Sequence, residues 1–222
     1  LASEHGVHTT DDVASAAAAD IIVLAVKPQV IAAVAKQMDA DLSGKLILSI
    51  AAGVTIASLE GIFGPVAIAR TMPNTPALLG LGATGLYVNE CASEAQRVAA
   101  KGIIAAFGIC VAVEREDLLD AVTAVSGSGP AYYFLMIEEM IRAGTTLGLS
   151  PEDAKALTLQ TALGAATMAN KGDAPEVLRA RVTSPNGTTH AAIVSMQENG
   201  FGDVIAKAMT ACRDRAVELG KA

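Results

Sequence analysis

The sequence predicts an α/β domain built on a mainly parallel sheet, followed by an all-helical domain. Between residues 9 and 113, short apolar runs such as Ile21-Ile22-Val23-Leu24-Ala25-Val26 alternate with helical patterns. Continuous apolar runs of this kind are typical of strands that are buried on both faces of a parallel sheet. After residue 117 only helical patterns occur, separated by turns that contain Gly or Pro. We therefore expect one domain at residues 1–116 and a second at residues 117–222.

The composition indicates a globular protein and argues against several classes of function. Of the 222 residues, 52% are hydrophobic, 18% are charged and 3% are aromatic, which predicts an aliphatic, Ala-rich core. The net charge of −7 and the lack of a basic cluster argue against a nucleic-acid partner. No apolar run reaches the roughly 18 residues that a membrane span requires. We expect a cytoplasmic protein without membrane contact.

Neither the cysteines nor the histidines form ligand-like groups in the sequence. Cys91, Cys110 and Cys212 are widely spaced and lack a C-x-x-C pair, which favours a reducing compartment. The three histidines likewise have no neighbouring ligands, so we expect no metal site.

The expected elements of the first domain alternate in chain order. Strands are expected at residues 21–26, 46–50, 66–69, 81–88 and 110–113, and helices at residues 11–19, 30–38, 56–63 and 94–107. We expect the segment 81–88 to be an edge strand. Repeated strand–helix–strand units predict a doubly wound sheet.

The second domain is expected to contain only helices. They are expected at residues 118–125, 130–147, 151–169, 175–181, 190–198 and 201–219. Ser126 or Ser128 is expected to cap the long second helix, with Pro130 in its first turn. These helices are apolar almost all round and cannot cover one another, which favours an intertwined dimer over a compact monomeric bundle.

Three loops of the first domain are expected to meet a ligand, because ligands bind at the carboxyl ends of parallel strands. Each loop lies at the carboxyl end of an expected strand. The loops are Ala25-Val26-Lys27-Pro28-Gln29, Ser49-Ile50-Ala51-Ala52-Gly53 and Arg70-Thr71-Met72-Pro73-Asn74-Thr75-Pro76. Lys27 could contact a phosphate or ribose or be a solvated surface lysine. The small residues Ala51 and Ala52 would let a flat ring lie against the backbone, or simply begin a helix.

One glycine motif is not expected to bind phosphate. Gly80-Leu81-Gly82-Ala83-Thr84-Gly85 matches G-x-G-x-x-G, but it enters a β-like stretch and not a helix. A functional glycine loop would precede Leu1. Because the chain opens in mid-pattern without Met, we expect it to be a fragment that lacks the first strand–turn–helix unit.

A polar stretch in the second domain predicts an anion site. Ser184-Pro185-Asn186-Gly187-Thr188-Thr189 leads directly into a helical pattern. The N–H groups of Gly187 and Thr188, with the hydroxyls around them, could hold a carboxylate at the positive end of the helix. An ordinary Ser or Thr helix cap is the alternative.

Taken together, these motifs resemble the pyrroline-5-carboxylate reductase family. The motifs in family order are Ala25-Val26-Lys27-Pro28, Ser49-Ile50-Ala51-Ala52-Gly53-Val54, Met72-Pro73-Asn74-Thr75-Pro76, Ser126-Gly127-Ser128-Gly129-Pro130-Ala131-Tyr132 and Ser184-Pro185-Asn186-Gly187-Thr188-Thr189. The resemblance implies a partial Rossmann-like domain followed by a helical dimerisation domain that interlocks with a second subunit, often within a decamer. It implies the last step of proline synthesis, in which hydride from NADPH or NADH reduces 1-pyrroline-5-carboxylate to L-proline.

The resemblance also implies roles for individual residues. Thr189 would hydrogen-bond the ring nitrogen as the catalytic residue. Ser184, Asn186, Gly187, Thr188 and Thr189 would form the substrate site. The residues bordering the cofactor would be Asp12, Ala25, Val26, Lys27, Pro28, Ala51, Ala52, Met72, Asn74 and Thr75.

Departures from the family pattern keep some points open. Asn186 replaces a common Gly, although Asn tolerates left-handed backbone well. Asp12 stands near a common Asn, and an acid there would disfavour a 2′-phosphate, so the choice between NADPH and NADH stays open. The alternatives are a non-catalytic dimerisation fragment and a β-hydroxyacid-type dehydrogenase, for which Lys155 or Lys171 would be the catalytic lysine.

Overall fold

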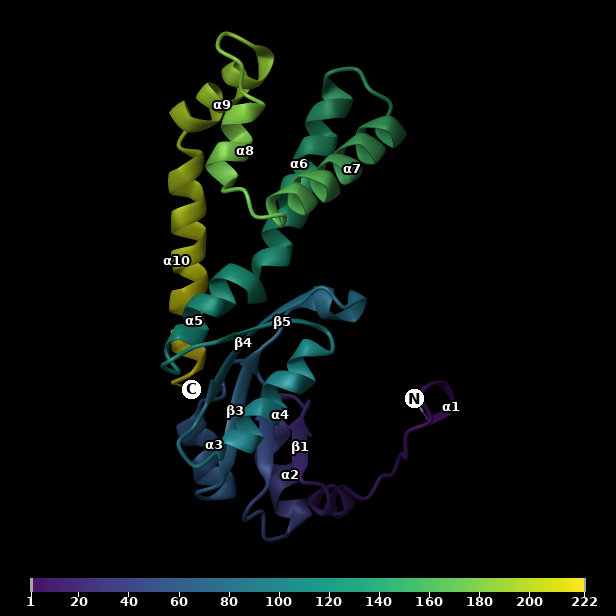
Figure 1. Cartoon of the computed structure of the whole chain (residues 1–222), viewed down its shortest axis with the longest axis vertical. Helices are drawn as coiled ribbons and strands as arrows, with labels where there is room; N and C mark the ends of the chain where they lie inside the picture. Colours follow the sequence, from purple (N-terminus) through teal and green to yellow (C-terminus); the bar gives the residue numbers. More distant parts are fainter. Residues whose placement is uncertain (1, 222) are drawn as a thin grey trace. The chain divides into compact units, whose positions relative to one another are not determined.

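The computed structural model describes residues 2–221, which form two compact units (Figure 1). One unit, the α/β unit, contains the chain up to Gly129 together with the residues from Ala211 onward. The other, the helical unit, is Pro130–Thr210. From Leu118 onward the described part of the chain forms only helices, close to residue 117, where the sequence predicts the change. The α/β unit nevertheless continues to Gly129. The division between residues 116 and 117 stays a prediction.

The α/β unit contains a five-stranded sheet in the order β1-β2-β3-β4-β5 within the described residues. β1, β2 and β3 are parallel to one another, with Leu24 opposite Ser49 and Ser49 opposite Arg70. β4 runs antiparallel to β3 and parallel to β5. The bounds are β1 (Ile21–Leu24), β2 (Leu46–Ser49), β3 (Ala67–Met72), β4 (Gly82–Val88) and β5 (Gly108–Ala112).

The expectation that segment 81–88 is an edge strand is wrong, because β4 lies between β3 and β5. Its glycines permit close packing there. A Cβ on Gly85 would lie only 2.6 Å from Cγ1 of Val122 on α5 (Leu118–Val122). β5 lies at that edge of the sheet instead, and its Ile109 and Val111 are exposed.

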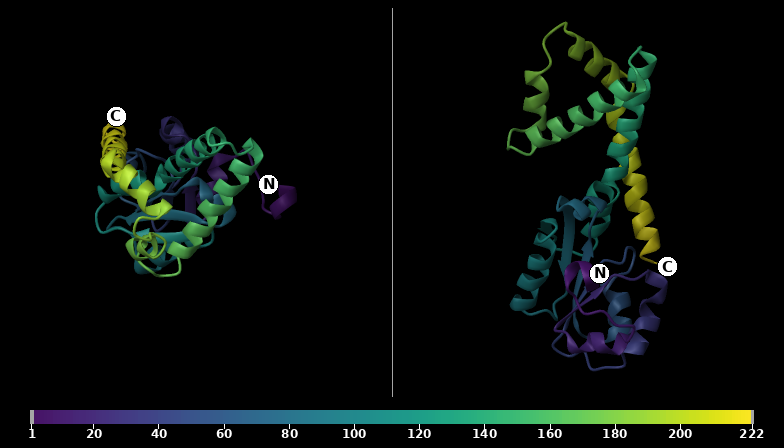
Figure 2. Two further views of the ribbon diagram at one scale, coloured as in Figure 1. Left: turned by 90° about the horizontal axis from the view of Figure 1, so that it is seen from above. Right: turned by 90° about the vertical axis from the view of Figure 1, so that its right-hand side faces the viewer.

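Helices cover both faces of the sheet (Figure 2). α2 (Ile31–Met38) and α3 (Ile56–Phe63) pack on one apolar cluster, which includes Ile47 and Ile68. α4 (Glu94–Ala105) packs on the cluster of the opposite face, which includes Leu48. Because successive residues of β2 and β3 are buried on opposite faces, residues 46–48 and 67–69 read as continuous apolar runs.

The first element after the N-terminal helix α1 (Ala2–His5) is shorter than the sequence indicates. In place of an α-helix at residues 11–19, the chain forms a 3₁₀ helix, η1 (Val13–Ala18). Asp12 caps it, since its Oδ1 accepts a hydrogen bond from the backbone N of Ala14 at 3.0 Å. The other 3₁₀ segments are η2 (Pro28–Val30) and η3 (Thr75–Leu79).

The expectation that Ser126 or Ser128 caps the long helix is wrong, because the chain is already helical at that point. A π-helix, η4 (Thr123–Gly127), joins α5 to α6 (Gly129–Thr146). Pro130 accounts for the wider turn, since a proline ring clashes with the carbonyl four residues earlier in a regular α-helix. The N–H of Ser128 donates instead to the carbonyl of Thr123 at 2.8 Å.

The remaining helices follow the predicted pattern closely. They are α7 (Pro151–Ala169), α8 (Pro175–Arg181), α9 (Thr188–Glu198) and α10 (Phe201–Leu219). Ser150 caps α7, accepting a hydrogen bond from the N–H of Asp153. Few apolar side chains of this unit are buried: Tyr133 is 72% exposed and Leu163 is 62% exposed. The expected uncovered apolar faces are therefore present.

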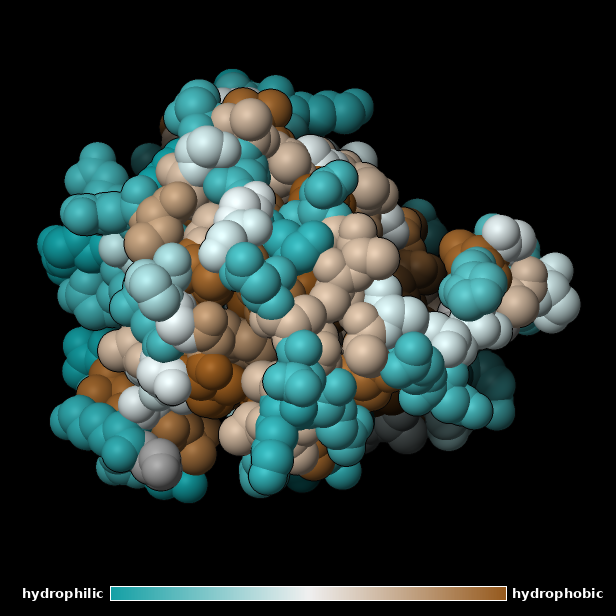
Figure 3. All heavy atoms as spheres, turned by 90° about the horizontal axis from the view of Figure 1, so that it is seen from below, coloured by the Kyte–Doolittle hydropathy of each residue, from teal (hydrophilic) through white to brown (hydrophobic). Residues whose placement is uncertain are grey.

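Apolar groups also reach the surface outside the helical unit. On the face shown in Figure 3, brown and tan groups lie between teal, polar ones. Among residues 2–221, no helix is both long and apolar enough to cross a membrane.

Candidate active site

The structure brings the three predicted cofactor loops to the same edge of the sheet. Ala25–Pro28 follow β1, Ala51 and Ala52 follow β2, and Met72–Thr75 complete β3 and the loop after it. Because β1, β2 and β3 are parallel neighbours, their carboxyl ends lie side by side. The predicted grouping of these residues at one edge follows directly from this topology.

Two hydrogen bonds, which involve the hydroxyls of Ser49 and Thr71, hold the loop after β2. The hydroxyl of Ser49 accepts a hydrogen bond from the N–H of Ala51 at 3.3 Å, and the hydroxyl of Thr71 donates to the carbonyl of Ser49 at 3.0 Å. Gly53 adopts φ +75°, a left-handed conformation that suits glycine. A Cβ on Gly53 would also lie 3.2 Å from the Cβ of Leu219. The loop is thus closely packed against the last turn of α10.

An ion pair joins β3 to the segment just before α5, and its carboxylate also bonds the start of α3. Nη1 of Arg70 lies 2.7 Å from Oε1 of Glu116, and Arg70 is only 8% exposed. The same oxygen accepts a hydrogen bond from the backbone N of Ile56 at 2.7 Å. Arg70 begins the third of the loops expected to meet a ligand, but no role in the site is predicted for Arg70 or Glu116. An arginine directly after an apolar strand indicates that a buried partner is needed, although the sequence does not tell which residue supplies it.

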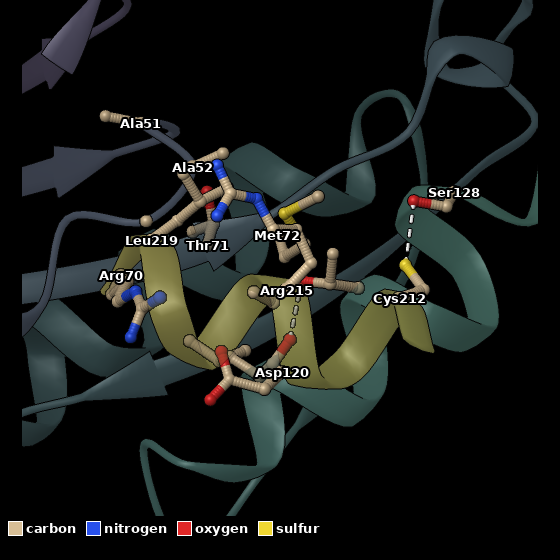
Figure 4. A pocket seen from close by; sticks show the side chains of 14 residues that line it. Ala51, Ala52, Arg70, Thr71, Met72, Asp120, Ser128, Cys212, Arg215 and Leu219 are labelled. Carbon is tan, nitrogen blue, oxygen red and sulfur yellow. Dashed lines mark hydrogen bonds between the residues drawn. The ribbon is translucent and has the colours of Figure 1, made fainter. Parts of the chain in front are cut away.

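A cavity of about 210 Å³ lies between these loops, α5 and the last turns of α10 (Figure 4). Sites that enclose a whole drug-sized ligand measure roughly 300–1,000 Å³, so this cavity has room for only part of a ligand. The side chains that line it include Ala52, Thr71, Met72, Asp120, Ser128 and Cys212. At one side of it, on the right in Figure 4, Sγ of Cys212 donates a hydrogen bond to the Ser128 hydroxyl at 3.2 Å.

Asp120 places a carboxyl group in the wall of this cavity. Burial raises the pKa of the Asp120 carboxyl above its ordinary value. The Arg70 guanidinium opposes that increase in pKa, whereas Glu116 and Asp117 add to it. Ionised Asp120 is therefore less stable in the folded protein than in water.

A second cavity of about 660 Å³ lies against the same loops, on the side of the sheet that α4 covers. Its apolar wall includes Leu48, Ile50 and Phe107, and the predicted residues Asn74 and Thr75 also line it. The loop after β3 therefore borders both cavities, with Met72 facing the smaller one and Asn74 the larger.

The Asn74 side chain is held by the protein at both ends of its amide. Nδ2 donates to the carbonyl of Ser126 at 3.0 Å, and Oδ1 accepts a hydrogen bond from the backbone N of Ala83 at 2.9 Å. These two hydrogen bonds tie the loop after β3 to the segments around Ser126 and Ala83. A direct contact of Asn74 with a cofactor stays a prediction.

The two ionisable residues predicted to meet the cofactor occupy different surroundings. Lys27 is exposed and precedes η2 without a side-chain hydrogen bond to that helix end, so its ammonium group is accessible to an anion. Asp12 lies before η1 and outside the three strand-end loops, and its carboxylate caps that helix.

The predicted substrate loop belongs to the helical unit. Asn186 adopts φ +61°, so it tolerates the left-handed conformation as expected. The N–H of Gly187 donates to the carbonyl of Ser184 at 3.0 Å, which leaves the next N–H groups, of Thr188 and Thr189, at the start of α9. No side chain caps α9, whose N-cap residue is Gly187. The ordinary Ser or Thr cap is therefore not what this loop forms.

No group of three or more His, Cys, Asp or Glu side chains is arranged to hold a metal ion among residues 2–221. The predicted site residues offer a ligand hydroxyls, backbone N–H groups, the exposed Lys27 side chain and small apolar side chains. Such groups can bind anions and orient a flat ring.

Comparison with protein families gives two matches along the chain. Residues 116–219 match the model described as pyrroline-5-carboxylate reductase dimerisation. Residues 1–53 match the model described as NADP oxidoreductase coenzyme F420-dependent.

Known proteins resemble the chain over its whole length. A pyrroline-5-carboxylate reductase of Pseudomonas aeruginosa is 50% identical over all of this chain and 82% of its own length. The structure of a Coxiella burnetii pyrroline-5-carboxylate reductase is 41% identical, with a TM-score of 0.93 over 100% of this chain and 84% of that one. A Plasmodium falciparum pyrroline carboxylate reductase with NADP bound is 35% identical, with a TM-score of 0.85 over 96% and 81% of the two chains. This chain therefore belongs to the pyrroline-5-carboxylate reductase family.

Proposed function

We infer that this chain reduces 1-pyrroline-5-carboxylate to L-proline with hydride from NADPH or NADH, the last step of proline synthesis. The observation that carries this conclusion is the 50% identity to the Pseudomonas aeruginosa reductase along the entire chain. The family membership favours this reaction over that of a β-hydroxyacid-type dehydrogenase.

The strand-end loops have the properties that a nicotinamide cofactor requires. Ala51 and Ala52 carry the smallest side chains, which leaves room for a flat ring beside the backbone. Met72, Asn74 and Thr75 would border that ring, and the free ammonium group of Lys27 would meet the ribose–phosphate part, beside Ala25, Val26 and Pro28. Asp12 would lie near the adenosine end. When bound, the cofactor supplies the hydride.

The start of α9 has the properties that a carboxylate requires. The hydroxyl of Ser184 and the backbone N–H groups at Gly187 and Thr188 would hold the substrate carboxylate, at the positive end of the helix. The Gly187 N–H can take part only by sharing or leaving its bond to Ser184. The Thr189 hydroxyl, on the same first turn, would hydrogen-bond the ring nitrogen and orient the imine.

This arrangement suits reduction of an imine without a strong acid. A protonated imine is already electrophilic, and addition of hydride to its carbon leaves the amine of proline. The protein's task is to align the ring with the cofactor and to exclude water. Hydroxyl and backbone N–H groups are sufficient for that task.

Substitution of Thr189 tests the proposed function and its central side chain. We expect Thr189→Ala to lower kcat/KM by roughly 10²-fold, as loss of one well-placed hydrogen bond does in other enzymes. Thr189→Ser retains the hydroxyl and is the matched control. Steady-state kinetics, with thermal unfolding of the same samples, separates lost activity from lost structure. A decline in kcat/KM that only follows the unfolded fraction would remove Thr189 from the site.

We further propose that the active form is a homodimer with interlocked helical domains, and that dimers assemble into a decamer. The support is the match to the dimerisation model and the exposure of Tyr133, Phe134 and Leu163. Light scattering after size-exclusion chromatography measures the assembly. A mass of one chain at micromolar concentration would contradict the dimer, and a mass of two chains would contradict the decamer.

A further inference from the structure

The carbonyl of Ser126, in the π-helix η4, lacks the backbone donor that a regular α-helix would give it. In a regular α-helix it would accept a hydrogen bond from the residue four positions later, which is Pro130. Proline has no N–H, so the chain itself cannot supply that donor. The amide Nδ2 of Asn74 supplies it instead, at 3.0 Å.

The same Asn74 side chain holds a third segment. Its Oδ1 accepts the hydrogen bond from the N–H of Ala83, at the start of β4. A single amide group therefore connects the loop after β3, the beginning of β4 and the π-helix η4. Both of its bonds are directed at backbone atoms, so they fix the course of the chain.

This link brings the π-helix against the wall of the smaller cavity. Gly127, the last residue of η4, lies so close to Met72 that a Cβ would be 2.5 Å from the methionine Cε. Met72, which lies two residues before Asn74, and Ser128, which directly follows Gly127, both line that cavity. The position of Met72 therefore depends on how η4 is held.

We propose that Asn74 is a positioning residue for hydride transfer. By bonding the Ser126 carbonyl that Pro130 leaves without a donor, it keeps η4 and Met72 in the geometry that aligns the nicotinamide ring with the imine. The role rests on the proposed function, and it differs from the predicted one, in which Asn74 contacts the cofactor directly.

The first variant is Asn74→Asp, which preserves the shape and the acceptor but removes the donor to Ser126. We expect kcat to decrease by about 10- to 100-fold, the loss that a misplacement of about 1 Å can cause. KM for the cofactor and for 1-pyrroline-5-carboxylate should change little, since both hydrogen bonds of the Asn74 amide go to backbone atoms and not to a ligand. Asn199→Asp is the matched control, because Asn199 also donates to a backbone carbonyl, that of Ser195, at 2.8 Å. It should leave kcat unchanged.

The second variant separates positioning from simple stabilisation. Pro130→Ala restores an N–H that can bond the Ser126 carbonyl and closes the π-helix into a regular turn. In the double variant Asn74→Asp with Pro130→Ala, we expect the melting temperature to recover toward that of Pro130→Ala alone. The kcat should stay low, because the regular turn no longer presents Gly127 to Met72. Recovery of both quantities together would overturn the proposal in favour of a purely structural role.

The kinetic pattern gives two further ways to overturn the proposal. If Asn74→Asp raises KM for the cofactor as much as it lowers kcat/KM, Asn74 is a direct cofactor contact. If it leaves kcat unchanged, Asn74 positions nothing. Amide hydrogen exchange at residues 71–76 and 123–129 should be faster in Asn74→Asp than in the wild type, and equal exchange would show that the link does not hold these segments. A wild-type chain without reductase activity would refute the proposed function, whereas the exchange measurement still decides the link.

Discussion

The two compact units of this chain differ in how far their apolar side chains are buried. In the α/β unit, Ile47, Leu59 and Ile68 are completely buried. In the helical unit, Phe134 on α6 is 58% exposed and Val204 on α10 is 60% exposed. The α/β unit therefore forms its own core, whereas the helical unit offers faces that burial against another surface would complete.

The polar groups near the predicted site residues also differ between the two units, in whether the protein itself bonds them. Around the strand-end loops, the polar groups of Ser49, Thr71 and Asn74 bond to other protein atoms. In the helical unit, no side chain caps the start of α9. The predicted cofactor loops are thus held by hydrogen bonds within the protein, whereas the predicted substrate loop precedes a helix start that no side chain caps.

Truncation of a core residue should have the largest effect in this comparison. We expect Ile68→Ala to lower the free energy of unfolding by about 2–5 kcal/mol, because it removes buried methyl groups and leaves a cavity. Leu163→Ala, on the exposed face of α7, is the control and should change the unfolding of the monomer little. Denaturant titration of both variants measures the difference. Equal losses under dissociating conditions would mean that the helical unit also has a complete core of its own.

The Arg70–Glu116 pair should have the next largest effect. Arg70→Met leaves the Glu116 carboxylate without its ion-pair partner, and we expect a loss of about 3 kcal/mol. This is at the lower end for broken buried pairs, because 26% of the Glu116 side chain is exposed. The double variant Arg70→Met with Glu116→Leu should recover stability in urea titrations. If the double variant is less stable than Arg70→Met, the bond from Glu116 to the Ile56 N–H is more important than the ion pair.

A charge on the exposed face of the helical unit should weaken assembly and not folding. We expect Phe134→Asp to reduce the affinity between subunits by at least about 30-fold, which corresponds to the roughly 2 kcal/mol of an interface hot spot. Analytical ultracentrifugation across a range of protein concentrations measures it. The control is Ala105→Asp, on α4 of the α/β unit. An unchanged dimer in Phe134→Asp would place the interface elsewhere.

The smallest effect should come from Asp120 and should depend on pH. Its carboxyl pKa is raised in the folded protein, chiefly by burial, so the folded state binds the proton more tightly than the unfolded state does. The stability that this proton contributes is complete below the unfolded pKa and is lost as the pH rises through the folded pKa. Asp120→Asn should therefore raise the melting temperature slightly at pH 7 and not at pH 3. Melting curves at the two pH values check this, and an increase confined to pH 3 would contradict it.

Much of the α/β fold could be predicted from local patterns. α3 has the predicted bounds Ile56–Phe63, because an N-cap and an apolar face coincide there. The position of β4 could not be predicted, since its glycines also suit an edge strand. Its central place depends on how closely Gly85 approaches Val122 on α5, and that contact is not local in the sequence.

The grouping of the three loops was predictable, because strand order alone determines it. The carboxyl-end rule places them at one edge of the sheet, as the structure does, whereas their contact with a cofactor stays a prediction. The Asn186 backbone angle agrees with its residue type. The Arg70–Glu116 pair and the bond from Asn74 to Ser126 join segments that are 46 and 52 residues apart. Their pairing depends on the assembled fold, so pattern alone could not reveal it.

The central claim is a division of labour, in which the α/β unit binds the cofactor and the start of α9 binds the substrate. Isothermal titration of Thr189→Ala and Lys27→Ala with NADPH and, separately, with L-proline tests it most directly. We predict that Thr189→Ala loses affinity for proline and keeps that for NADPH, and that Lys27→Ala does the reverse. Loss of both affinities in either folded variant, or of neither in both variants, would contradict the claim.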